Sequence, residues 1–143
     1  MKLKNILFVI LLFFLLYNFK TYSQSLNQEN SFIAILNCDI ENLLVPVDNG
    51  FKKVDFYIKG INNKNQVDEL INMFYSFGGV VDCSFIQSDT DKDIYNVKIK
   101  FYQKVNLNFF IKMLVTFNIN SVIYKDVLQP TESLKRFINS EIN

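Results

Sequence analysis

The chain has 143 residues, enough for one folded domain, and half of these residues are hydrophobic. Fifteen Phe and seven Tyr supply bulky core side chains, so the composition is not that of a disordered chain. The 15 basic and 14 acidic side chains nearly balance. The chain has no histidine, which excludes Ser/His and Cys/His catalytic pairs and the commonest zinc ligand.

The first 23 residues are predicted to be a secretory signal peptide. Two lysines, at positions 2 and 4, precede an apolar run over Ile6–Leu16. A signal peptide needs about 7–15 apolar residues, whereas a membrane-spanning helix needs about 20. Small residues stand three and one positions before Gln24, as signal peptidase requires. We therefore expect a mature chain that begins at Gln24 and is periplasmic or secreted; an uncleaved membrane anchor is the alternative.

Cleavage would make the protein mildly acidic. Residues 1–23 contain three lysines and no acid, so residues 24–143 keep 12 basic and 14 acidic side chains. Nucleic-acid binding needs a basic stripe, which this dispersed charge does not supply. We expect no nucleic-acid partner, and no membrane span after cleavage.

Residues 24–50 are predicted to form a polar tether and a short helical segment. Gln24–Ser31 is rich in Asn and Gln. Apolar residues in Phe32–Val45 follow a helical period, and Pro46 would end the helix. An extended segment over Phe32–Leu36 is the alternative.

Residues 51–127 show strand and helix patterns in the order β-α-β-β-α-β. Strands are predicted where apolar and polar residues alternate, around Val54–Ile58, Val81–Phe85 and Tyr95–Phe101, and over Ser121–Val127. Amphipathic helices are predicted over Val67–Phe77, ended by Gly78 and Gly79, and over Leu107–Phe117. This order predicts an α+β fold of the ferredoxin-like type, a two-layer sandwich with two helices on one face of a four-stranded antiparallel sheet.

The remaining residues, 128–143, are predicted to contain a C-terminal helix with an apolar stripe formed by Leu134, Phe137, Ile138 and Ile142. The helix at 107–117 is also apolar on its other side, at Phe109 and Met113. We therefore expect either the Phe32–Val45 segment or the C-terminal helix to pack there.

The uncovered face of such a sheet is a candidate partner surface. The strand alternation directs five side chains to it: Tyr57, Ile86, Lys98, Lys100 and Tyr102. This face combines solvated charges with aromatic anchors, so a protein partner could bind there.

Two cysteines, Cys38 and Cys83, could form a disulfide in an exported protein or serve a metal-binding or thiol-redox role. They could also be buried thiols that pack as small apolar residues. The strand pattern places Cys83 on the helix-covered face, which predicts that it is buried.

Carboxylates alternate at Asp89, Asp91 and Asp93 in the predicted hairpin turn. This run has no glycine where a calcium loop turns and no Glu at the end of a twelve-residue frame, so a solvated turn is predicted. We predict no catalytic residue, no cofactor-binding residue and no metal ligand.

The run Val54–Val81 resembles the heavy-metal-associated domains, the small copper-carrier fold. Gly60-Ile61 corresponds to the Gly-Met that ends the first strand of that family, and Gly79-Val80 to its later Gly-Val. Asn63 and Gln66 occupy the positions of the two metal-binding cysteines. The resemblance therefore implies a degenerate ferredoxin-like domain without the Cys-x-x-Cys site, because neutral amides are poor ligands for Cu(I).

These features together favour an exported, non-enzymatic domain of the cell envelope, a protein-interaction or accessory module. A metal-binding or thiol-redox role through Cys38 and Cys83 is the alternative.

Overall fold

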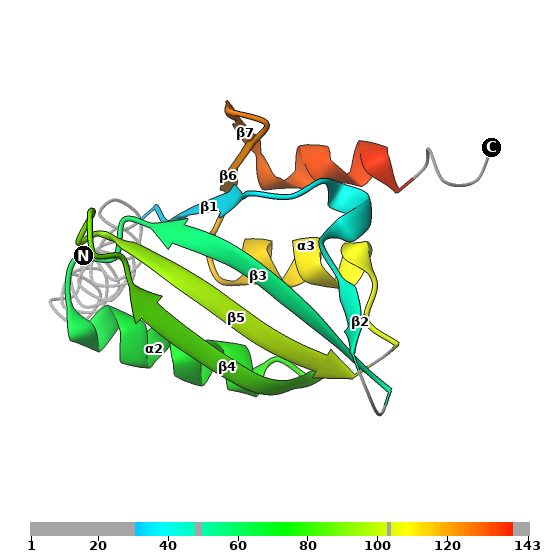
Figure 1. Ribbon diagram of the computed structural model, residues 1–143, viewed down its shortest axis with the longest axis horizontal. Helices are drawn as coiled ribbons and strands as arrows, with labels where there is room; N and C mark the ends of the chain where they lie inside the picture. Colours follow the sequence, from blue (N-terminus) through cyan, green and yellow to red (C-terminus); the bar gives the residue numbers. More distant parts are fainter. Residues whose placement is uncertain (1–30, 48–49, 103, 139–143) are drawn as a thin grey trace, which may run out of the picture.

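The computed structural model describes residues 31–47, 50–102 and 104–138 (Figure 1). The predicted signal peptide, the polar tether except Ser31, and Ile142 lie outside these residues. Seven strands form one sheet: β1 (Ile33–Leu36), β2 (Val45–Val47), β3 (Phe51–Lys59), β4 (Val80–Gln87), β5 (Ile94–Tyr102), β6 (Ser121–Tyr124) and β7 (Val127–Pro130). The helices are α2 (Lys64–Ser76), α3 (Leu107–Thr116) and two 3-10 helices, η1 (Ile40–Asn42) and η2 (Thr131–Phe137).

The prediction of a helix over Phe32–Val45 is wrong. Ile33–Leu36 forms β1, which lies inside the sheet, antiparallel to β3 and parallel to β6. The residues that follow form only the single 3-10 turn η1 before β2 pairs with β3. The extended alternative for Phe32–Leu36 is confirmed, although β1 is an inner strand and not an edge strand.

The predicted βαββαβ order is present, but the sheet is not the simple four-stranded one. Its strand order is β4-β5-β3-β1-β6-β7, with β2 beside β3. The N-terminal strand β1 thus separates β3 from β6, the first and last strands of the predicted motif. The general α+β class is correct, and the prediction of four strands is wrong.

The C-terminal region also differs from its prediction. The strand predicted over Ser121–Val127 ends at Tyr124, where Lys125 and Asp126 make a two-residue turn into β7. Both turn residues have positive φ, 50° and 60°, as a type I′ hairpin turn requires. Instead of an α-helix, the 3-10 helix η2 follows.

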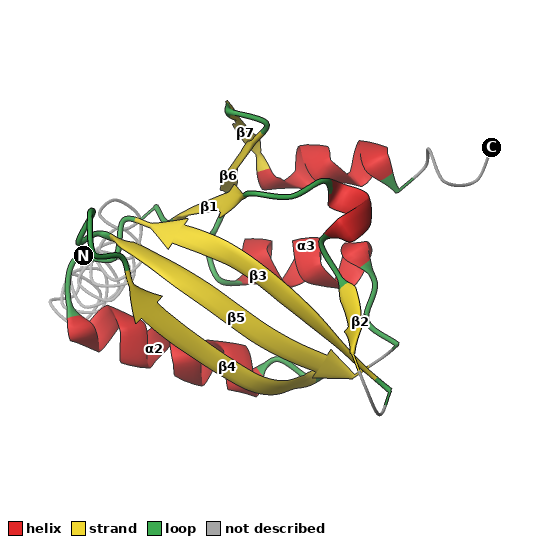
Figure 2. Cartoon of the chain, in the orientation of Figure 1, coloured by secondary structure: helices red, strands yellow, loops and turns green. Residues whose placement is uncertain are grey.

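Helices α2 and α3 cover one face of β3, β5 and β4 (Figure 2). Phe56 of β3 meets Phe110 of α3 edge-to-face at 5.3 Å between ring centroids, and both side chains are fully buried. On the other flank of α3, η2 packs through buried Leu134 and covers Tyr124 with Phe137. The C-terminal segment therefore contacts α3, but Phe109, on the side where this cover was expected, packs against Phe77 and Phe101 instead.

Candidate functional site

The helix-free side of the sheet, here called the outer face, is set by the alternation of side chains along each strand. Val54, Phe56 and Ile58 of β3 are buried beneath the helices, so the residues between them point the other way. Cys83 is buried on the helix-covered side, which confirms the predicted register of β4. That register places all five predicted surface residues, Tyr57, Ile86, Lys98, Lys100 and Tyr102, on the outer face.

One line of directly paired residues crosses the whole outer face. The strand registers place them side by side in the order Ile86, Asn96, Tyr57, Ile35, Ile123 and Leu128, here called the outer row. Neighbouring strands lie about 4.8 Å apart, so the five intervals span roughly 24 Å. Five of the six side chains are aliphatic or aromatic, which makes the row a continuous apolar strip.

The two ends of the outer row are its most exposed parts. Ile86 is 55% exposed and Leu128 is 61% exposed, whereas the four residues between them are half-buried. Single exposed apolar residues are ordinary on protein surfaces, but a strip that joins them across six strands is a candidate interaction site. Sequence reasoning found Tyr57 and Ile86 and missed Ile35, Ile123 and Leu128.

Asn96 interrupts the apolar row with an unsatisfied polar atom. Its Nδ2 donates to Asp55 Oδ1 at 2.7 Å, while its buried Oδ1 has no hydrogen-bond donor among the described residues. Exchanging the two amide atoms would bring Oδ1 against the Asp55 carboxylate, so the orientation is determined. A buried acceptor without a partner costs about 1–3 kcal/mol, which is a reason to suspect a functional role for this side chain.

Replacing Asn96 with valine is expected to raise the free energy of unfolding by about 1 kcal/mol. The change removes the unsatisfied acceptor and introduces a residue that favours strands, and both effects stabilise the protein. It also loses one hydrogen bond to the partly exposed Asp55, which costs less. Urea unfolding followed by circular dichroism measures the difference. A loss of stability in Asn96→Val would mean that the amide is satisfied in the folded protein.

Charged and aromatic side chains occupy the outer face beside the row. Lys98 lies 3.8 Å from Asp55, and both side chains are about half exposed, so this ion pair adds little stability. Tyr102 is 57% exposed and its ring lies 5.9 Å from that of Phe51. The outer face is therefore apolar along its row and basic-aromatic toward Tyr102.

The structure does not bring Cys38 and Cys83 together. Both are free thiols; Cys38 follows β1, Cys83 lies in β4, and β3 and β5 intervene. Three strand intervals amount to about 14 Å, whereas a disulfide needs Cα atoms within about 7 Å.

Neither cysteine has the environment of a reactive thiolate. Burial and the negative charge of Asp82 raise the pKa of Cys83 to about 12. Burial, and then the charges of Asp39 and Asp55, raise the pKa of Cys38. Redox and metal-binding cysteines depend on the thiolate, which both sites disfavour.

Thiol titration of the denatured protein, without reductant, is expected to give two free thiols per chain. In the native protein at pH 8, Cys83 is expected to react far more slowly than the half-buried Cys38, since its pKa of about 12 keeps it protonated. Fewer than two thiols after denaturation would contradict the separation of the two strands and favour a redox role.

A shallow hollow of about 480 Å³ lies at the carboxyl ends of the parallel strands β1 and β6. Lys125 Nζ lies 3.0 Å from Asp39 Oδ1 across it, and Cys38 is in its lining. The hydrogen bond to Asp39 raises the pKa of Lys125, and the ion pair joins the two loops. The facing charges of Lys125 and Asp39 therefore satisfy each other.

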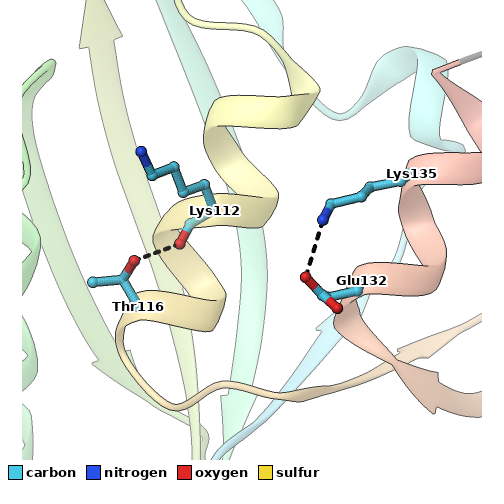
Figure 3. Close-up of polar contacts among 4 residues, drawn as sticks. All are labelled: Lys112, Thr116, Glu132 and Lys135. Carbon is cyan, nitrogen blue, oxygen red and sulfur yellow. Dashed lines mark hydrogen bonds and ion pairs between the residues drawn. The ribbon is translucent and has the colours of Figure 1, made fainter.

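A second hollow, of about 360 Å³, is an open groove between α3 and η2. Figure 3 shows that Glu132 and Lys135 pair on η2, at 3.0 Å, while the Lys112 ammonium points away from η2. Thr116 Oγ1 donates to the Lys112 carbonyl at 2.8 Å, within the helix. The polar groups of this groove therefore bond along their own helices and do not converge on a ligand position.

Asn63 and Gln66, at the positions where copper carriers have cysteines, cap the first turn of α2. The Asn63 side chain accepts from the Gln66 backbone N–H at 3.0 Å. Gln66 Oε1 in turn accepts from the Asn62 N–H at 2.7 Å. Both amide oxygens thus satisfy helix-terminal donors, as in a capping box.

The carboxylates of the hairpin turn are close enough to interact. A hydrogen bond from Asp91, then burial and the Asp91 charge, raise the pKa of Asp93, and the Lys59 charge opposes this. The Asp93 backbone carbonyl meanwhile accepts from the Gly60 and Ile61 N–H groups and fixes the turn to the end of β3.

Within residues 31–47, 50–102 and 104–138, no three His, Cys, Asp or Glu side chains are grouped to hold a metal ion. Over the same residues, no helix is long and apolar enough to cross a bilayer. No protein-family model, no curated protein and no solved structure matches the chain.

Proposed function

We propose that this chain is an exported, non-enzymatic domain of the cell envelope that binds a protein partner through its outer face. The observation that carries the proposal is the outer row, an apolar strip that runs through six strands on the side without helices. Export rests on the N-terminal sequence, whose lysines and short apolar run are typical of a signal peptide.

The properties of the row suit a protein partner. Its exposed ends provide apolar anchors, and its half-buried centre continues the apolar surface between them. Fully desolvated aromatic and aliphatic side chains supply most of the free energy at protein interfaces, with polar groups at the rim. Lys98 and Asp55 lie beside the row as such a rim.

The fold is proposed to be an elaborated ferredoxin-like domain. Strands β3, β4, β5 and β6 and helices α2 and α3 follow the βαββαβ order along the chain. Moving β1 and β7 aside would leave the spatial order β4-β5-β3-β6, that of a ferredoxin-like sheet. Gly60 and Gly79, which match glycines of the heavy-metal-associated domains, both have positive φ and support this relation. In this chain the loop that would bind metal caps α2 instead, through Asn63.

Site-specific photo-crosslinking in the producing cells tests the function. A photoreactive residue is placed at Ile86 and, separately, at Leu128, the two exposed ends of the outer row. The matched control is Glu69, an exposed residue of α2 on the covered side of the sheet. We expect one cross-linked protein of the same mass from both row positions and none from Glu69.

A second set of variants separates binding from folding. Ile86→Glu and Leu128→Glu are expected to weaken binding of the cross-linked protein at least tenfold and to leave the free energy of unfolding nearly unchanged, since both side chains are more than half exposed. Equal cross-linking from Glu69, or none from the row, would refute the proposal.

A further inference from the structure

A second surface lies at one end of the outer face, where β2 and the start of β3 meet the end of β5 (Figure 1). The strand registers place its side chains in two adjacent rows, Val45–Lys53–Lys100 and Val47–Phe51–Tyr102, here called the outer corner. Three of the apolar residues are exposed: Val45 by 51%, Val47 by 37% and Tyr102 by 57%. The outer corner thus presents aliphatic, aromatic and basic side chains together.

The two lysines of the outer corner face each other, and neither forms an ion pair with a carboxylate of the described residues. Lys53 and Lys100 are a direct cross-strand pair, an arrangement that like charges make unfavourable. No carboxylate among the described residues lies within ion-pair distance of either ammonium. Asp82, which is paired with Lys100 across the strands, bonds instead to the Tyr75 hydroxyl and the Cys83 N–H. The positive charge is therefore available for an external anion.

The aromatic rings hold one of these charges in place. Lys100 Nζ lies 4.3 Å from the centroid of the Phe51 ring, a cation–π contact. Phe51 in turn contacts Tyr102, which extends furthest into solvent. An ammonium, an amphipathic phenol and exposed valines on one surface are the components that proteins use at the boundary between lipid headgroups and acyl chains.

We infer that the outer corner docks on an anionic membrane surface, with Lys53 and Lys100 at the lipid phosphates and Tyr102, Val45 and Val47 at the headgroup level. This inference does not depend on the proposed function. An added peptide strand fits poorly beside β2, because Pro46 has no N–H to donate. The two hollows described above lie elsewhere.

Vesicle co-sedimentation tests the inference with the protein purified in its exported form. The probes are vesicles of phosphatidylcholine alone and vesicles that also contain phosphatidylglycerol. Each lysine near an anionic surface strengthens binding about fivefold, so Lys53→Glu/Lys100→Glu is expected to lower affinity for the anionic vesicles at least tenfold. Lys64→Glu/Lys112→Glu, which makes the same charge change at exposed helix positions, is expected to have little effect.

The apolar contribution is tested separately, by Tyr102→Ser/Val45→Ser, which should also weaken binding to anionic vesicles. Equal binding to both kinds of vesicle would overturn the inference, because any apolar segment can bind neutral lipid. An equal loss in the two lysine double variants would overturn it as well. If vesicles fail to bind but a poly-glutamate peptide binds in a manner that needs Lys53 and Lys100, the corner recognises an acidic protein and the membrane assignment is wrong.

Discussion

Replacing Ala34 with proline is expected to lower the free energy of unfolding by about 3 kcal/mol or more. Ala34 is fully buried at the middle of β1, opposite Ile58 on β3 and Val122 on β6. Because β1 is hydrogen-bonded on both sides, proline removes a ladder donor from the interior of the sheet. The proline ring would also collide with neighbours that leave no free space around this small side chain.

The matched control for this change is Ala34→Gly, which keeps the N–H group and is expected to cost only about 1 kcal/mol. Urea unfolding, followed by circular dichroism, compares the two variants. If Ala34→Pro were no more destabilising than Ala34→Gly, β1 would not be an integral strand, and the sheet would reduce to the four-stranded arrangement that the sequence suggests.

The sequence misleads at β1 for a physical reason. Ile35 of β1 lies in the apolar outer row, so the outward side chains of this strand are apolar like its buried ones and no apolar-polar alternation appears. A short apolar run such as Phe32–Leu36 then fits a helix or a strand equally well. Only the pairing with β3 and β6, distant in sequence, decides between them.

The hairpin of β6 and β7 was missed because its turn lacks the usual signal. Two-residue type I′ turns favour Asn-Gly or Asp-Gly, which adopt positive φ without strain. Lys125-Asp126 adopts that geometry without glycine, and the Lys125–Asp39 ion pair helps to hold it. A pattern search for turn residues therefore has nothing to detect.

The side chains of the outer row could be predicted only on strands that the sequence itself predicts. On β3, β4 and β5 the apolar-polar alternation is regular, and it placed Tyr57, Ile86 and Tyr102 on the correct face. Ile35 and Leu128 belong to β1 and β7, which were not recognised as strands, so these two of the six residues of the outer row could not be inferred. Strand order depends on contacts between residues far apart in the sequence. It joins the outer residues of β3, β4 and β5 to those of β1, β6 and β7 in one strip.

The second large effect is expected at Phe117, where replacement by alanine should lower the free energy of unfolding by about 3–5 kcal/mol. Phe117 is 5% exposed at the end of α3. Its ring meets Phe74 at 5.1 Å and Phe77 at 5.4 Å, both edge-to-face, and both of these partners come from the α2 side. Truncation leaves a cavity between the two helices and removes two aromatic pairs, each worth about 0.5–1.5 kcal/mol beyond its buried area.

Phe117 is the link in a longer series of ring contacts. Phe74 continues to Phe85 on β4, and Phe77 continues through Phe109 to Phe101 on β5. The series therefore joins both helices to the strands beneath them. Neighbouring rings in such a series should be coupled. The double variant Phe117→Ala/Phe77→Ala is therefore expected to lose less unfolding free energy than the two single variants lose together.

Phe117→Leu is the control, because it keeps most of the volume and loses only the ring geometry, for an expected cost below about 1.5 kcal/mol. Typical domains have only about 5–15 kcal/mol of stability, so the alanine variant should unfold at a clearly lower urea concentration while the leucine variant stays close to the wild type. Equal midpoints for the alanine and leucine variants would show that the helices can close over the missing ring. In that case α2 and α3 would pack as a deformable layer, and the position of the outer face would depend on the strand pairing alone.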